Sequence, residues 1–251
     1  MDVSLYQAAS GMNASSRWQE IIAENLASSQ IPGFKRQDVS FSGVQSGYLA
    51  RAPGALSGPA QRFQMPLAAS STNFQPGELR NTGVSTDLAI EGTGFFEVQM
   101  PDGTHGYTRD GEFRVDLQGQ LVNKQGLPVM GEGGPIQLDP RTASPVTVAV
   151  NGQISQAGIV VGQLKIAEFN DTKALVPAGG GCFTVADPAI QPNTPAMVTV
   201  HQGYLESSNT SSVLEMGNLI TAMRLYEANQ KVAQMEDDRI NHLIADVASP
   251  T

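Results

Sequence analysis

The sequence contains a single cysteine, Cys182, among its 251 residues. One thiol can form neither an internal disulfide nor a zinc site built from several thiolates. Charged residues are also scarce, at 16%, and the formal net charge is −9. Because basic clusters are absent, we expect this acidic chain to bind neither nucleic acid nor an anionic membrane surface.

Long apolar runs are missing as well. No stretch of the sequence reaches the roughly 20 apolar residues that a membrane-spanning helix needs. The first 18 residues have no basic segment followed by a continuous apolar one, which a cleavable secretory signal would show. We therefore expect no membrane insertion and no cleaved signal peptide.

Recognisable catalytic and ligand-binding motifs are lacking too. His105, His201 and His242 are far apart and form no zinc-binding pattern. Residues 92–97 begin like a dinucleotide-binding loop but carry a glutamate where the third glycine should stand. The acidic residues 236–238 are consecutive, so on a helix they diverge by about 100° each. The sequence predicts no catalytic, cofactor-binding or metal-binding residue and no enzyme, although a carboxylate pair for glycosidic cleavage depends on the fold and stays open.

What the sequence does contain favours strands and turns over residues 75–203. Glycine and proline are frequent in the whole chain, at 26 and 15 residues, and within 75–203 short apolar segments alternate with turn signals. Asp102-Gly103 and the run 118–120 are typical of hairpin turns. The alternation of Phe113, Val115 and Leu117 indicates a half-buried strand. These features predict a compact β domain.

Both ends of the chain instead show helical periodicity. Over residues 3–26 small, apolar and a few polar residues recur at alternating spacings of three and four, the pattern of a coiled-coil seam, before Pro32-Gly33 ends the helix. A similar pattern follows over residues 214–246, with Gln230 and Asp237 as polar positions within it. The first seam contains Leu5, Ala8, Met12, Ser15, Gln19, Ile22 and Leu26, and the second Met216, Leu219, Met223, Tyr226, Gln230, Ala233, Asp237, Ile240 and Ile244.

The matching seams predict that the two terminal helices pair with each other as a coiled coil. Two separate helices that each pack on the β domain are the alternative. The expected fold class is α+β, with paired N- and C-terminal helices and a central, mostly antiparallel β domain. The expected domains are a helical one from residues 1–36 and 204–251, an extended connector at 37–74 with room for a hairpin, and the β domain at 75–203.

Four sequence blocks resemble the flagellar basal-body rod protein family, the rod and hook axial proteins of bacteria. They are AENLA with PGFKR near the start, TDLAIEGTGFF, YTRDGEF with GQLV after it, and GYLESSN with RLYEAN near the end. Their order and spacing over nearly the whole chain make the resemblance specific. The matching motif residues are Asn25, Leu26, Gly33, Phe34, Asp87, Gly92, Gly94, Phe95, Phe96, Tyr107, Arg109, Gly111, Leu205, Glu206, Asn209, Tyr226 and Glu227.

The resemblance implies a structural subunit that polymerises into the helical rod of the flagellum and transmits torque from motor to hook. It implies as partners further copies of the chain, neighbouring rod proteins and the flagellar type III export apparatus, and a place in the periplasmic rod of the basal body. No cofactor is implied. The polymer contacts would be led by the helix positions Leu5, Met12, Ile22, Leu26, Met216, Leu219, Met223 and Tyr226.

Within the family, residues 129–136 and 162–165 look more like the proximal-rod member than the distal-rod member, and the chain is short for a hook-type subunit. Outside the family, the rivals are a secreted carbohydrate-binding module and a peptidoglycan hydrolase. A carbohydrate binder would present an exposed aromatic platform, yet the one tryptophan, Trp18, lies in the first predicted helix.

Overall fold

The computed structural model describes residues 3–48, 62–139, 141, 144–187, 189–195 and 198–248. The chain divides into two compact units. Unit 1 comprises Met1–Ala27, Gln37–Ser71 and Ser211–Thr251, and unit 2 comprises Ser28–Arg36 and Thr72–Thr210. Each unit is therefore assembled from segments that are distant in sequence.

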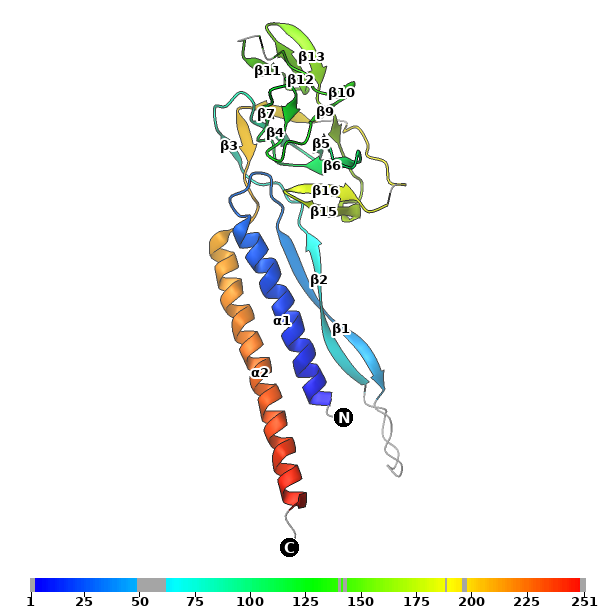
Figure 1. The fold of residues 1–251 in the computed structure, drawn as a ribbon, viewed down its shortest axis with the longest axis vertical. Helices are drawn as coiled ribbons and strands as arrows, with labels where there is room; N and C mark the ends of the chain where they lie inside the picture. The colour runs from blue at the N-terminus through cyan, green and yellow to red at the C-terminus, as the bar shows by residue number, and fades with distance from the viewer. Residues whose placement is uncertain are drawn as a thin grey trace. The chain divides into compact units, whose positions relative to one another are not determined.

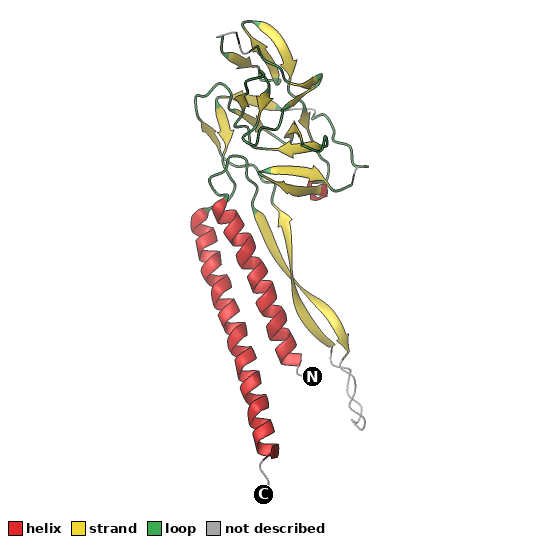
Figure 2. Cartoon of the chain, viewed as in Figure 1, coloured by secondary structure: helices red, strands yellow, loops and turns green. Residues whose placement is uncertain are grey.

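Unit 1 consists of two helices and a long hairpin (Figure 1). Helix α1 spans Val3–Ala27 and helix α2 spans Ser212–Ala248, while strands β1 (Gln37–Tyr48) and β2 (Arg62–Thr72) form a two-stranded antiparallel ribbon whose last residue belongs to unit 2. The helices lie side by side and run antiparallel, and α2 extends past the N-terminal end of α1 (Figure 2). Neither helix contains, within its described residues, an apolar stretch long enough to cross a membrane.

Unit 2 is built from short antiparallel strands. Its largest sheet has five strands in the order β14-β5-β6-β16-β15, and a second sheet has three, β11-β12-β13. The late strands β17 and β18 return to pair with the early strands β4 and β3. The strands are β3 (Leu79–Asn81), β4 (Leu88–Glu91), β5 (Phe95–Gln99), β6 (His105–Thr108), β7 (Arg114–Val115), β8 (Leu121–Val122), β9 (Met130–Gly131), β10 (Gly134–Pro135), β11 (Val146–Val148), β12 (Gln153–Gln156), β13 (Ile159–Gln163), β14 (Ile166–Ala167), β15 (Leu175–Gly179), β16 (Cys182–Val185), β17 (Thr199–Gln202) and β18 (Tyr204–Glu206), with a 3₁₀ turn at Thr172–Ala174.

Two predicted hairpin turns lie where the sequence places them. Gly103, between β5 and β6, and Gly119, between β7 and β8, each have a φ of +82°, a left-handed conformation that glycine adopts without strain. The alternation predicted for the strand after Phe113 is wrong, because Val115 is 38% exposed and Leu117 is almost fully exposed. The reason is that β7 ends at Val115, so Leu117 falls in the turn.

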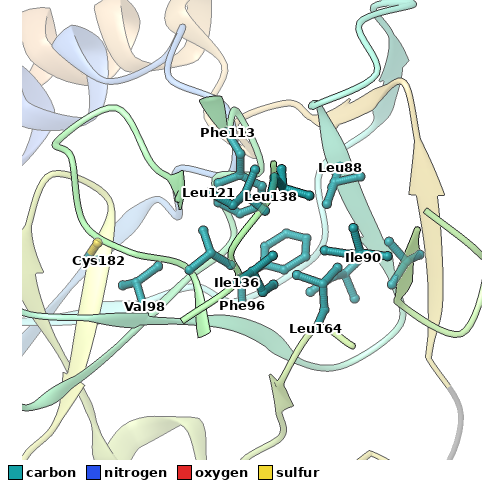
Figure 3. Packing of buried hydrophobic residues seen from close by; sticks show 13 residues of the cluster. Leu88, Ile90, Phe96, Val98, Phe113, Leu121, Ile136, Leu138, Leu164 and Cys182 are labelled. Carbon is teal, nitrogen blue, oxygen red and sulfur yellow. The ribbon is translucent and has the colours of Figure 1, made fainter. Parts of the chain in front are cut away.

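The core of unit 2 has two clusters because β5 is buried on both faces. Phe96 packs on one side with residues such as Val98, Phe113 and Leu164, where Cys182 also lies buried (Figure 3). Phe95 points to the other side and joins the second cluster. Adjacent strand residues point to opposite faces, so the pair Phe95-Phe96 anchors both clusters. The second cluster contains Phe95, Tyr107, Ala167, Phe169, Leu175 and Phe183.

The predicted α+β class is confirmed in its coarser form, with two helices and a mostly antiparallel β unit. The unit boundaries differ from the expected domains. The described parts of the expected connector form strands β1 and β2, and residues 37–71 group with the helices, while Ser28–Arg36, residues 72–74 and residues 204–210 group with the β unit.

Candidate functional site

The contact between α1 and α2 is lined by small side chains. On α1, Ala8 and Ser15 are buried and Gly11 is half-buried. A Cβ added to Gly11 would lie 2.9 Å from the side-chain atoms of Asn229, so α2 approaches α1 closely at this glycine. About two turns further on, the Gln19 amide donates a hydrogen bond to the Ala222 carbonyl at 3.3 Å. Small residues allow this proximity but bury little apolar area.

The face that α2 turns toward α1 keeps Leu219, Ala233 and Ile240 of the expected seam, but at its other positions it uses the residue one place earlier in the sequence. The expected positions Met216 and Met223 are 48% and 51% exposed, and Gln230 and Asp237 are exposed as well. In the single chain these four positions are therefore not covered by α1. Because the two faces share residues, they differ by a rotation smaller than the roughly 100° between consecutive residues, and Ala222, not Met223, is buried. The less exposed face contains Glu215, Leu219, Ala222, Asn229, Ala233, Glu236 and Ile240.

Helix α1 also contacts the hairpin. The Trp18 and Phe41 rings meet edge to face with centroids 5.5 Å apart, and the Ser10 hydroxyl donates to the Pro66 carbonyl at 3.0 Å. Near the end of the helix the buried side chain of Asn25 donates to the Gln37 carbonyl and accepts from the Gln37 amide, both at 2.9 Å. An asparagine is required here because its side chain pairs with a donor and an acceptor of one backbone residue.

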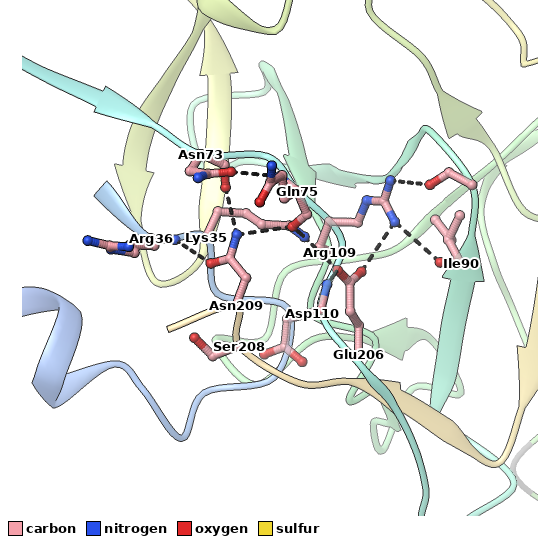
Figure 4. Close-up of polar contacts among 12 residues, drawn as sticks. Lys35, Arg36, Asn73, Gln75, Ile90, Arg109, Asp110, Glu206, Ser208 and Asn209 are labelled. Carbon is pink, nitrogen blue, oxygen red and sulfur yellow. Dashed lines mark hydrogen bonds and ion pairs between the residues drawn. The ribbon is translucent and has the colours of Figure 1, made fainter. Parts of the chain in front are cut away.

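Unit 2 contains a buried ionic cluster, here termed the junction cluster, made of Lys35, Arg109, Glu206 and Asn209 (Figure 4). The Lys35 ammonium lies 2.5 Å from one Glu206 oxygen, and the Arg109 guanidinium lies 3.2 Å from the other. Both cations also donate to backbone carbonyls, whereas the buried Nε of Arg109 has no hydrogen-bond partner. Lys35 donates to Gln75, and Arg109 donates to Ile90 and Gly92. One carboxylate therefore neutralises two cations from distant parts of the chain.

Asn209 completes the cluster by binding two other segments. Its side-chain oxygen accepts from the Arg36 amide at 2.7 Å, and its amide group donates to the carbonyls of Asn73 and Gln75 at 2.8 and 3.0 Å. The Gly33 amide donates to the Glu206 carbonyl at 2.7 Å. The segments that follow α1, follow β2 and precede α2 are thus joined to one another inside unit 2.

Burial governs the protonation of this cluster. Loss of solvent lowers the pKa of the Lys35 ammonium, and the nearby Arg109 lowers it further, while Glu206 acts in the opposite direction. Burial also lowers the pKa of Arg109, again opposed by Glu206. Both cations depend on the same carboxylate for their compensation. Removing that carboxylate would leave two buried positive charges without a partner.

Two glycines of the predicted motif are required by close backbone approach. Gly33 has a φ of +67°, and a Cβ there would lie 2.2 Å from the Arg109 carbonyl carbon. A Cβ on Gly111 would lie 1.6 Å from the Leu88 carbonyl oxygen. Any side chain at either position would push apart the segments that carry the junction cluster.

Comparison with known proteins fits this architecture. Residues 89–156 match the family described as flagellar hook protein FlgE/F/G D1 domain, and residues 201–245 match the flagellar basal body rod FlgEFG protein C-terminal family. The flagellar basal-body rod protein FlgF of Caulobacter vibrioides is 37% identical, with 95% of this chain and 94% of the relative covered. The chain belongs to the flagellar basal-body rod protein family. FlgG of Borreliella burgdorferi is 32% identical over 94% of this chain and 96% of its own.

Membership in this family makes the chain a structural subunit of the flagellar basal-body rod, as the sequence predicted. It is a component of the basal body and assembles with other flagellar components. The matches do not favour the rival interpretations as a secreted carbohydrate-binding module or a peptidoglycan hydrolase. FlgF and FlgG relatives both match, including FlgG of Bacillus subtilis at 30% identity over 96% of this chain and 97% of the relative.

The motif residues of this flagellar subunit separate into three structural groups. Gly33, Phe34, Arg109, Glu206 and Asn209 meet at the junction cluster, where Gly92 supplies a carbonyl. Others lie in or against the β core: Phe95, Phe96, Tyr107 and Leu205 are buried, Asp87 accepts from the Thr82 hydroxyl, Gly94 has a φ of +151°, and Gly111 packs on Leu88. Asn25, Leu26, Tyr226 and Glu227 belong to the helices of unit 1.

The predicted polymer positions differ in their exposure. Ile22 is buried, and Leu5, Met12, Leu26 and Leu219 are half-buried. Met216, Met223 and Tyr226 are exposed. Sequence reasoning missed Lys35 as a site residue, although its position directly after the Gly33-Phe34 motif was an available signal. It also missed Gln75, which contributes only a backbone carbonyl that no side-chain pattern could reveal.

Two histidines form local pairs with glutamates on the β unit. His105 lies 2.7 Å from Glu97, and His201 lies 2.7 Å from Glu91. Within the described part of the chain no three His, Cys, Asp or Glu side chains are grouped so as to hold a metal ion. A cavity of about 310 Å³ is lined by Glu132, Asn151, Gln163, Leu164, Lys165, Ile166, Thr194, Pro195 and Val198.

Proposed function

We propose that this subunit polymerises through its terminal helices into the helical tube of the rod, which carries torque from the motor to the hook. The observation that supports the proposal is the exposed apolar surface of α2. Large apolar side chains are exposed along most of this helix in the single chain, at Val213, Leu214, Met216, Ile220, Met223, Leu225, Tyr226, Val232 and Met235. A soluble monomer rarely exposes so many neighbouring apolar groups without a partner surface.

The small side chains at the contact between α1 and α2 are consistent with assembly. Ala8, Gly11, Ser15 and Ala222 bury little apolar area there. Helices in proteins gain most of their stability from tertiary packing of an apolar face. Neighbouring subunits that cover α2 would therefore stabilise the helix pair at the moment of assembly. The three-four spacing on both helices supports a coiled coil in the assembled rod.

The polymer contacts include Met216, Met223 and Tyr226, whose exposure leaves them available to a neighbour. The half-buried residues Leu5, Met12, Leu26 and Leu219 border the α1–α2 contact and serve as its margin. Buried Ile22 acts within the chain. In this proposal the helices form the inner layer of the tube, and the β1–β2 hairpin bridges subunits.

The finer assignments rest on the resemblance of the chain to its family. We place the subunit at the proximal level of the periplasmic rod, with the distal level as the alternative. We also propose export through the flagellar type III apparatus without a cleaved signal, and contacts with copies of itself and with adjacent rod proteins. No catalytic activity is part of the proposed role.

Electron microscopy of basal bodies from a deletion strain, beside the complemented parent, tests the role and the level. Basal bodies whose axial structure stops within the rod are the expected result, and the point of termination identifies the level. An intact rod and hook in the deletion strain would contradict the proposal. A muramidase assay on the purified protein provides an independent check on enzymatic activity.

A further inference from the structure

Helix α2 exposes apolar side chains on both sides of the face that it turns toward α1. Successive residues advance by about 100° around a helix, so sequence position gives direction around the axis. Met216 and Met223 lie on one side of the α1-facing residues, with Ile220 further around the helix, and we term these three residues the first flank. Leu214, Leu225 and Val232 lie on the other side and form the second flank. These six side chains are between 38% and 64% exposed.

The two flanks are not equivalent. The first is apolar only near the start of α2, because its three-four spacing continues through Glu227, Gln230 and Gln234. The second is interrupted by Asn218 and Thr221 and becomes apolar further along, where Ala228 and Val232 follow Leu225 in the same spacing. A surface that pairs with itself gives a closed dimer, whereas two different complementary surfaces give an open helical polymer.

We propose that the first flank of one copy packs against the second flank of α2 in the next copy. This inference rests on the proposed function and names the surfaces that join neighbouring subunits. Both flanks border the α1–α2 contact, so the new contact would extend an existing helical interface. Because all subunits of a helical polymer have the same polarity, adjacent α2 helices would run parallel.

Helix α1 is a poorer partner for either flank. Its exposed residues are mainly small or polar, and include Asn13, Arg17, Glu20 and Glu24. Among the large apolar side chains described in α1, only that of Tyr6 is exposed, at 49%. An apolar flank is best covered by another apolar helical surface at matching spacing, and α2 carries two of them.

Cysteine cross-linking tests this arrangement in the full chain within purified basal bodies. In a Cys182→Ala background, Met216→Cys or Met223→Cys marks the first flank, and Leu225→Cys or Val232→Cys marks the second. A disulfide forms only where Cα atoms approach within about 7 Å. Residues 223 and 225 point to different sides of one helix, so they cannot form a disulfide within a chain.

After oxidation and non-reducing electrophoresis, chains with one cysteine on each flank should form ladders of dimers, trimers and longer species. Co-expressed single variants, one per flank, should give dimers. Each single variant alone should stay monomeric. Asn13→Cys marks the polar face of α1, and chains that combine it with a cysteine on either flank should also stay monomeric.

Dimers from one single variant alone would overturn the proposal in favour of a self-paired flank. Basal bodies that contain the variants but yield no cross-link, or cross-links only to other proteins, would also overturn it and leave the rod function intact. Absence of the unmodified subunit from purified basal bodies would instead contradict the proposed function.

Discussion

Lys35 and Glu206 are separated by 171 residues in sequence, yet their charged atoms lie 2.5 Å apart in the interior of unit 2. Lys35 lies near the end of the segment that follows α1, and Glu206 is the last residue of strand β18, shortly before α2. Because both groups are buried, removing either one would leave the other as a buried charge without this partner. The β unit is therefore complete only when both segments that flank the helices have joined it.

Glu206→Gln should destabilise unit 2 by about 3 to 5 kcal/mol, because it leaves the Lys35 and Arg109 cations buried without a compensating charge. Lys35→Met should cost less, since Arg109 still neutralises Glu206. Denaturant titration followed by circular dichroism measures both. Glu20→Gln, which breaks the exposed pair with Arg17, is the control and should cost about 0 to 1 kcal/mol. A larger loss for Lys35→Met than for Glu206→Gln would contradict this account of the cluster.

Asp110→Asn should stabilise the protein at alkaline pH and have little effect near pH 4. Burial, with smaller contributions from Glu112 and Asp87, raises the pKa of the Asp110 carboxyl to about 6, against about 3.9 in an unfolded chain. The folded state therefore holds the proton more tightly, and the resulting stability is lost as pH rises through 6. The gain for Asp110→Asn at pH 8 should approach 2 to 3 kcal/mol.

The asparagine can keep the hydrogen bond that the Asp110 carboxyl accepts from the Glu112 amide. Urea denaturation at several pH values between 4 and 8 gives the comparison. Asp171→Asn alters an exposed carboxyl and serves as control. An advantage for Asp110→Asn that is equally large at pH 4 and pH 8 would show that the carboxyl is not responsible.

Gly11→Leu should separate α1 from α2, because even a Cβ at this position lies 2.9 Å from Asn229. Loss of helical signal at lower temperature is expected in thermal melts. Gly217→Ala is the matched control, since a Cβ there meets nothing within 4 Å. This change should stabilise α2 by about 0.5 to 1 kcal/mol through helix propensity alone. Equal effects of the two substitutions would argue against close approach at Gly11.

Met223→Asp should prevent rod assembly and leave the isolated subunit folded. Met223 is 51% exposed, so a charge there disturbs the single chain little but would be buried in the polymer. Ala222→Asp should fail earlier, in the monomer, because Ala222 is buried against α1. Circular dichroism of the purified subunit reports whether each variant folds, and motility and basal-body microscopy report whether it assembles. Asn13→Asp, an exposed change on α1, should assemble normally, and normal motility of Met223→Asp would refute the proposed contact.

Local sequence determined much of this protein. The three-four spacing predicted helices at both ends, and α1 and α2 lie there. Turn residues predicted hairpins at Gly103 and Gly119 because glycine alone adopts their backbone angles freely. The order of the four motif blocks predicted the flagellar family, which the relatives confirm.

Tertiary structure decided which surfaces meet. Spacing on α2 fits two adjacent faces almost equally, and only the close approach of Gly11 to Asn229 selects the face with Ala222 over the face with Met223. The junction cluster likewise depends on segments that no local pattern relates. Periodicity reports the direction of side chains within one element, whereas the identity of a partner depends on packing and charge compensation between elements that are distant in the chain.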